Sequence, residues 1–243
     1  MRVVILAAGV GARLMPLTRN TPKSLLDLGD GYTLLEHQLR SIAAAGIRDV
    51  SLVTGYRSEQ IEAKIHSYSE FRFTIVYNPV YRMTNNIVSA WMGLKDVNEP
   101  VVLVNGDDLF RPSVITNLIA SPHEITMVID RKDAYDEDDM KVVIADDLIV
   151  DVGKGIPSET ANGESIGMML FRGRGLRDTQ ASLMTMMRQE ENLQLFYLES
   201  LRRLMHQRHP IHFSECEAND WAEVDFHPDL DHMRQQLQLK GMG

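Results

Sequence analysis

The first hundred residues alternate between short apolar runs and helical patterns, and this order restricts the fold more than any other feature. Continuous β-type runs occur at 3–6, 50–53, 73–77 and 101–104. Helical patterns separate them at 35–43, 58–65 and 85–94, with Ser58 and Asn85 as the predicted caps of the last two. This order predicts an α/β fold with a Rossmann-like, mostly parallel central sheet flanked by helices.

The second half of the chain has a different pattern, with more strands and fewer helices. Strands are predicted at 125–130, 141–145, 148–152, 165–171 and 211–216. Helices are predicted around 184–187, 197–205 and 229–237. Because neither a linker nor an internal repeat separates the halves, we expect a single domain over residues 1–243, divided near residue 120 into a first half and a β-rich second half.

Composition argues against several classes of function. A formal net charge of −9 disfavours general nucleic-acid binding, which needs a basic surface. Cys216 is the only cysteine, so we expect neither an intrachain disulfide nor a cysteine metal cluster. The N-terminus lacks a signal-peptide pattern, and no run approaches the roughly 18 apolar residues of a membrane span. We therefore predict a soluble cytoplasmic protein.

The first apolar run ends in a glycine-containing turn that is followed by two cations. Gly9 and Gly11 allow backbone N–H groups to approach a phosphate, and Arg13 and Lys23 can balance its charge. A Walker loop would place Lys and Ser or Thr directly after the last glycine, where this chain has Ala-Arg. A dinucleotide fingerprint would need a third glycine where the chain has Leu14. The motif predicts a nucleoside triphosphate site of another type.

The whole motif resembles that of the nucleotidyltransferase superfamily that activates sugar phosphates and alcohol phosphates. The signature of that family is Leu-Ala-Ala-Gly-x-Gly-x-Arg after a strand, then Pro-x-Thr and Thr-Pro-Lys, and each element is present. The resemblance implies that Arg13 and Lys23 are catalytic residues that hold the phosphates. It further implies that the nucleotide contacts Leu6, Ala7, Ala8, Gly9 and Gly11, and that Asn85 and Ser89 read its base.

Two acidic segments are candidates for a metal site. Asp107 follows the run at 101–104, at the strand end where open α/β sheets bind ligands, and aspartate oxygens suit Mg²⁺. The Asn-Gly-Asp-Asp sequence is equally typical of a turn. The resemblance implies that Asp107 and Asp225 bind Mg²⁺, and Glu223 is the competing candidate for the second position.

For the acceptor side, the resemblance implies roles for residues that composition alone would leave on the surface. Lys154 is expected to be the catalytic lysine that binds the acceptor phosphate, with Lys141 as a weaker candidate. Glu164 is expected to bind the hydroxyl or amine of the acceptor. The expected region also offers Tyr135 and the acidic residues 136–139 but no tryptophan, which favours an amine or hydroxyl over a quaternary ammonium.

The compact chain and its Thr-Asn-Asn-Ile-x-Ser and Trp-x-Glu-x-Asp segments resemble most the bacterial choline-phosphate cytidylyltransferases. The implied reaction joins CTP to a small phosphorylated alcohol or phosphonate and releases pyrophosphate, with Mg²⁺ as cofactor. The first half would bind the nucleotide and the second half the acceptor, with a homodimer left open. A sugar-1-phosphate nucleotidyltransferase using UTP, dTTP or GTP is the enzymatic alternative. A non-catalytic nucleotide-sensing module is the alternative of another class.

Overall fold

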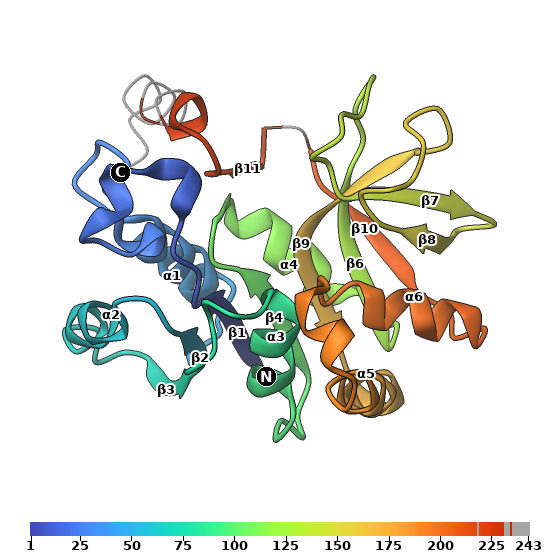
Figure 1. The fold of residues 1–243 in the computed structure, drawn as a ribbon, viewed down its shortest axis with the longest axis horizontal. Helices are drawn as coiled ribbons and strands as arrows, with labels where there is room; N and C mark the ends of the chain where they lie inside the picture. Colours follow the sequence, from blue (N-terminus) through green and yellow to red (C-terminus); the bar gives the residue numbers. More distant parts are fainter. Residues whose placement is uncertain (218, 231–233, 235–243) are drawn as a thin grey trace.

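The first half of the chain forms the parallel part of a large sheet. The computed structural model describes residues 1–217, 219–230 and 234 (Figure 1). Four strands are mutually parallel in the order β4-β1-β2-β3, and they are β1 (Arg2–Ala7), β2 (Asp49–Thr54), β3 (Arg72–Tyr77) and β4 (Val101–Asn105). All four coincide with the predicted runs to within two residues, so the predicted α/β class is confirmed.

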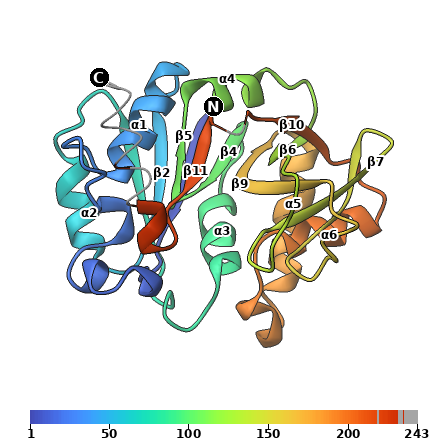
Figure 2. The same cartoon turned by 90° about the horizontal axis from the view of Figure 1, so that it is seen from above.

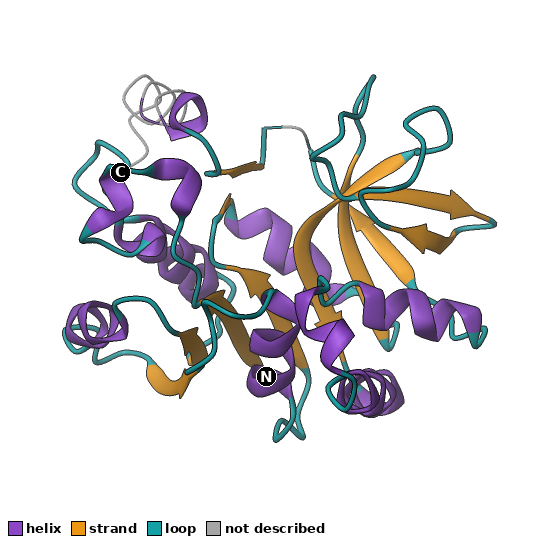
Figure 3. Ribbon diagram, viewed as in Figure 1, coloured by secondary structure: helices purple, strands orange, loops and turns teal. Residues whose placement is uncertain are grey.

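The second half extends the same sheet beyond β4. Its strands are β6 (Ile125–Asp130), β7 (Lys141–Ala145), β8 (Leu148–Val152), β9 (Gly163–Phe171) and β10 (His212–Glu215). The fully buried β9 lies between β4 and β6 and is antiparallel to both, whereas β10 is parallel to β6. The hairpin β7–β8 attaches to the end of β9 and extends away from the main sheet (Figure 3). One hydrogen-bonded sheet therefore runs through both halves.

Helices cover both faces of this sheet and bury two apolar cores. One core lies under α1 (Leu34–Ala44), α2 (Ser58–Ile65) and α4 (Pro112–Ala120). The other lies under α3 (Asn86–Leu94), α5 (Gly173–Met186) and α6 (Glu199–His206). Short 3₁₀ turns lie at Ala12–Leu14, Leu17–Arg19, Lys23–Leu25 and Glu190–Gln194, and residues 227–230 are also helical. Within the described ranges, no helix combines the length and the apolar character that a membrane span requires.

A small ribbon lies above the carboxyl ends of the central strands. It pairs β5 (Asp108–Phe110) antiparallel with β11 (Trp221–Glu223), and Figure 2 shows the two strands side by side next to β4. The sequence did not predict β5 or α4. Since β11 comes from the end of the described chain and β5 from its middle, this pairing brings two segments that are distant in sequence together.

Helix ends differ from the predictions at α2 and at α5. Asn85 caps α3 as predicted, because its side chain accepts a hydrogen bond from the backbone of Asn86 at 2.7 Å. Ser58 is not a cap: α2 begins at Ser58 after a left-handed Arg57, and the Ser58 hydroxyl bonds within the structure to Thr54 and Glu62. The helix predicted around 184–187 is the last turn of α5, which begins at residue 173, and most of the helix predicted over 229–237 lies outside the described residues.

Gly106 allows the β4–β5 turn to lie against the end of β1. Its backbone N–H donates to the Leu6 carbonyl at 3.0 Å, and a Cβ at this position would lie 2.4 Å from the same oxygen. Because backbone cannot move aside as a side chain can, we expect Gly106→Ala to lower the free energy of unfolding by about 1–3 kcal/mol or more. Urea unfolding measures this. Gly155→Ala is the control, since among the described residues nothing beyond its chain neighbours lies within 4 Å of its Cβ position, and equal losses in both variants would contradict the prediction.

Candidate active site

A cleft of about 510 Å³ lies at the carboxyl ends of β1 and β4 and extends along β9. Open α/β sheets bind ligands at this edge. Every residue predicted to contact the nucleotide lines the cleft, namely Leu6, Ala7, Ala8, Gly9, Gly11, Asn85 and Ser89. The predicted residues Arg13, Lys23, Asp107, Lys154, Glu164 and Asp225 line it as well. The structure thus gathers segments from both halves of the chain around one space.

Three carboxylates converge at one end of the cleft. Each of Asp107, Glu223 and Asp225 offers an oxygen, and these oxygens all lie within 4.8 Å of one another. The β5–β11 ribbon creates this arrangement, with Glu223 opposite Asp108 and the N–H of Val224 donating to the Asp107 carbonyl at 3.0 Å. Sequence reasoning treated Glu223 as a competitor of Asp225, whereas the structure brings both to the cluster.

The donor set of this cluster fits a divalent cation. Carboxylate oxygens are the ligands that Mg²⁺ prefers, and Mg²⁺ commonly takes one or two carboxylates together with phosphate oxygens. Three carboxylates at this separation repel one another, and a cation between them relieves that repulsion. The open cleft beside the cluster leaves room for phosphate and water ligands.

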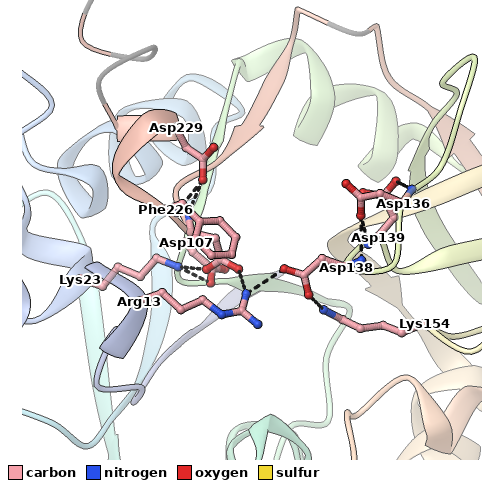
Figure 4. Close-up of polar contacts among 10 residues, drawn as sticks. Arg13, Lys23, Asp107, Asp136, Asp138, Asp139, Lys154, Phe226 and Asp229 are labelled. Carbon is pink, nitrogen blue, oxygen red and sulfur yellow. Dashed lines mark hydrogen bonds and ion pairs between the residues drawn. The ribbon is translucent and has the colours of Figure 1, made fainter. Parts of the chain in front are cut away.

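Two cations from the N-terminal motif contact the same carboxylates (Figure 4). The Nζ of Lys23 donates to Asp107 at 2.9 Å and also to Asp225, and the Nη1 of Arg13 donates to Asp225 at 2.9 Å. Burial of Lys23 opposes its charge, but the attraction of Asp107 and Asp225 outweighs burial and raises the pKa of the ammonium. Lys23 therefore remains charged within the cluster.

The glycine-containing turn sets the path of these cations. Gly11 adopts φ +64°, and a Cβ there would lie 3.0 Å from Thr18 and 3.1 Å from Lys23. The Thr18 hydroxyl donates to the Gly11 carbonyl at 2.7 Å, which holds the turn against the segment before Lys23. A side chain at Gly11 would thus strain the backbone and press on the stem of Lys23.

Two of the predicted acceptor residues lie on the opposite side of the cleft. Lys154 donates to Asp138, and its ammonium lies 5.5 Å from the centre of the Phe196 ring. Glu164, on β9, is 5% exposed and forms an ion pair with Lys132. Burial raises the pKa of Glu164 to about 7, because it outweighs the opposing attraction of Lys132.

The other two do not line the described cleft. Lys141 is buried, and its Nζ donates to the backbone carbonyl of Asp136 at 2.6 Å. The Tyr135 hydroxyl accepts from the backbone N–H of Lys132 at 3.3 Å. In this structure both residues stabilise the loop between β6 and β7.

Several cleft residues were missed by sequence reasoning. Asp138 contacts both Arg13 and Lys154, although the sequence offered it only as part of an acidic segment. The cleft is also lined by the aromatic residues Tyr81, Phe196, Tyr197 and Trp221, none of which the sequence had singled out as an aromatic contact. Near the base-reading candidates, the Asn78 amide donates to the Ser89 hydroxyl at 3.0 Å. These contacts join residues from separate loops, so no local motif marks them.

The titration of Glu164 predicts a pH-dependent stability. The unfolded chain has the ordinary pKa of 4.5 for this group, whereas the folded value is about 7. Between these values the folded protein holds a proton that the unfolded chain has released, so the contribution of Glu164 to stability falls as pH rises through this window. Glutamine does not titrate, so Glu164→Gln should gain stability relative to wild type from pH 5 to 7, by on the order of 1–3 kcal/mol. Urea unfolding at several pH values measures this, and a difference independent of pH would contradict it.

Comparison with known sequences identifies the family. The sequence profile described as "Nucleotidyl transferase" matches residues 2–152, which is more than half of the chain. The chain belongs to the nucleotidyl transferase family. The match covers the glycine-containing motif and Asp107 and ends before Lys154. The expectation drawn from the motif is therefore confirmed at the level of the family.

Individual relatives include several cytidylyltransferases. The chain is 31% identical over 64% of its length to a choline-phosphate cytidylyltransferase of Streptococcus pneumoniae, of which it covers 66%. It is 24% identical over 95% of its length to a CTP:phosphoglutamine cytidylyltransferase of Campylobacter jejuni, of which it covers 98%. It also matches a CMP-5'-(3-aminopropyl)phosphonate synthase of Streptomyces rubellomurinus, with 33% identity over 54% of the chain, but spans only 21% of that protein.

Solved structures share the fold over almost the whole chain. A CTP:phosphocholine cytidylyltransferase from Streptococcus pneumoniae has a TM-score of 0.79 at 22% identity, with 97% of this chain and 98% of that chain covered. An inositol-1-phosphate CTP transferase from T. maritima has a TM-score of 0.80 at 20% identity, covering all of this chain and 97% of that one. At these identities the likeness concerns the fold.

Proposed function

We propose that this protein is a magnesium-dependent cytidylyltransferase that joins CTP to a small phosphorylated alcohol or phosphonate. The observation that carries the proposal is the convergence of Asp107, Glu223 and Asp225 with Arg13 and Lys23 in one cleft that also contains Lys154. A cation site beside two phosphate-binding cations suits a triphosphate, and a further lysine across the cleft suits a second anion. A purely sensory module would not need this second cationic position.

The proposed reaction is an in-line substitution at the α-phosphorus. An anionic oxygen of the acceptor forms a bond to that phosphorus, while the bond from the α-phosphorus to the bridging oxygen breaks. Pyrophosphate leaves with the electron pair. Because the attacking oxygen is already ionised near neutral pH, no general base is needed, and catalysis comes from positioning and charge neutralisation.

Eight residues of the cleft have a role in this proposal. Arg13 and Lys23 hold the triphosphate and neutralise charge on the departing pyrophosphate, and Lys154 orients the acceptor against the repulsion between two anions. Asp107, Glu223 and Asp225 would hold Mg²⁺, which supplies charge neutralisation at phosphate oxygens. Asn85 and Ser89 offer the amide and hydroxyl groups that can pair with a cytosine edge. The named cytidylyltransferase relatives support CTP over other nucleotides.

A matrix of four nucleoside triphosphates against several acceptors tests the proposal. The acceptors are phosphocholine, 2-aminoethylphosphonate and a set of sugar 1-phosphates, with Mg²⁺ present and pyrophosphate release measured. We expect turnover with CTP and a phosphorylated alcohol or phosphonate. Turnover only with a sugar 1-phosphate would select the sugar alternative. Triphosphate binding without turnover across the panel would select the nucleotide-sensing alternative.

A further inference from the structure

The side chain of Asp138 connects Arg13 on one side of the cleft with Lys154 on the other. Its Oδ2 accepts from Arg13 Nη1 at 3.0 Å, and its Oδ1 accepts from the ammonium of Lys154 at 2.5 Å (Figure 4). Arg13 belongs to the N-terminal motif, whereas Lys154 follows β8. One carboxylate therefore connects the residues that, under the proposed function, hold the nucleotide and the acceptor.

The loop between β6 and β7 presents Asp138 in a defined position. Asp136 accepts from the backbone N–H groups of Asp138 and Asp139 at 2.7 and 3.0 Å, and Asp139 accepts from the N–H of Asp136 at 2.9 Å. Two lysines also stabilise the loop. Lys141 donates to the backbone carbonyl of Asp136, and Lys132 donates to the carboxylate of Asp139. This network accounts for the buried ammonium of Lys141 and keeps Asp138 directed into the cleft.

A substrate phosphate can replace Asp138 on either cation at little cost, because each cation keeps other contacts or donors. Arg13 uses Nη1 for both Asp138 and Asp225, and a guanidinium has further donors on Nε and Nη2. The ring of Phe196 supports Lys154 independently of Asp138. The side chains of Arg13, Asp138 and Lys154 are 49%, 44% and 32% exposed, and ion pairs this accessible to water exchange at little cost.

We propose that Asp138 is a positioning residue that couples the two substrate sites, a proposal that rests on the proposed function. Its carboxylate accepts from Arg13 and Lys154 as a substrate phosphate would. A nucleotide that replaces Asp138 on Arg13 leaves the carboxylate held by Lys154 alone. Arg13 then no longer holds the carboxylate of Asp138 in place. The acceptor phosphate therefore displaces Asp138 from Lys154 more readily. Nucleotide and acceptor therefore bind with positive cooperativity, and the effect is reciprocal.

Calorimetry on the Asp138→Asn variant tests this coupling. The probes are α,β-methylene-CTP with Mg²⁺ and either 2-aminoethylphosphonate or phosphocholine, each titrated alone and in the presence of the other. We expect each probe alone to bind about 2–5-fold more tightly to the variant than to wild type. We also expect the factor by which one probe improves binding of the other to fall by a similar amount, a change that a purely structural role would not produce.

Glu137→Gln is the matched control, because it removes the same charge from the same loop. Glu137 is exposed and does not line the described cleft. Equal effects of the two variants, an unchanged coupling factor, or weaker nucleotide binding in Asp138→Asn would overturn the proposal. Binding is measured without turnover, so a wild-type protein that binds both probes but transfers nothing would contradict the proposed function and leave the Asp138 comparison valid.

Discussion

Asp107→Asn should lower the rate of pyrophosphate release by about 10³-fold at saturating substrates, because an amide is a poor substitute for a carboxylate that neutralises a divalent cation. The variant should fold, since the Asp107 backbone carbonyl still accepts from Val224 and Lys23 still pairs with Asp225. A second measurement is the rise in melting temperature caused by Mg²⁺, which should shrink in the variant. Steady-state assays with the substrate pair used by the wild type give the rate.

Asp96→Asn serves as the control for this experiment. Its side chain is 88% exposed, and its one described ion pair, with Lys95, is long at 3.9 Å. It should retain the wild-type rate and the wild-type response to Mg²⁺. If Asp107→Asn also kept near wild-type turnover, the assignment of the carboxylate cluster to the metal would be wrong.

Lys23→Met should lower turnover by about 10²-fold and at the same time make Mg²⁺ a stronger stabiliser of the fold. Methionine preserves the length and apolar stem of lysine but leaves Asp107 and Asp225 without the ammonium that both now contact. The carboxylates would then repel one another more strongly, so the metal-free protein melts at a lower temperature. Bound Mg²⁺ relieves this repulsion. The melting temperatures with and without Mg²⁺ should therefore differ by more in the variant than in wild type.

The two readouts of Lys23→Met move in opposite directions, which distinguishes a specific role from general damage. A variant that was merely misfolded would lose activity and its response to Mg²⁺ together. Lys95→Met is the control, because Lys95 is partly exposed and lies outside the cleft lining. An unchanged Mg²⁺ response in Lys23→Met would mean that the ammonium and the cation do not share these carboxylates.

The part of the cleft lined by residues 6–11 could be predicted because these residues are close in sequence. Leu6 to Gly11 lie on the end of one strand and the turn after it, so a local motif specifies their geometry. Asp107 could be predicted for the same reason, because it lies just after the end of β4. The parallel direction of the first four strands was likewise predictable from the helices between them.

The part of the cleft around Asp138 and Lys154 could not be predicted to the same extent, because contacts between distant segments create it. A buried apolar run such as β9 has the same composition whether it pairs parallel or antiparallel, so the sequence did not indicate its direction. In the same way, the sequence did not indicate that the side chain of Lys141 is buried. Lysines are usually exposed, and the carbonyl of Asp136, which a loop supplies, compensates the burial of this ammonium.

The β5–β11 ribbon has a consequence for the order in which the protein becomes active during synthesis. Asp225 meets Arg13 across 212 positions and Lys23 across 202 positions of sequence. The strands of the first half emerge from the ribosome long before these carboxylates, and contacts between such distant residues form late in folding. A nascent chain can thus assemble its phosphate-binding turn while its proposed metal site is still incomplete. Nucleotide chemistry would begin only when residues 221–225 have emerged and β11 has paired with β5.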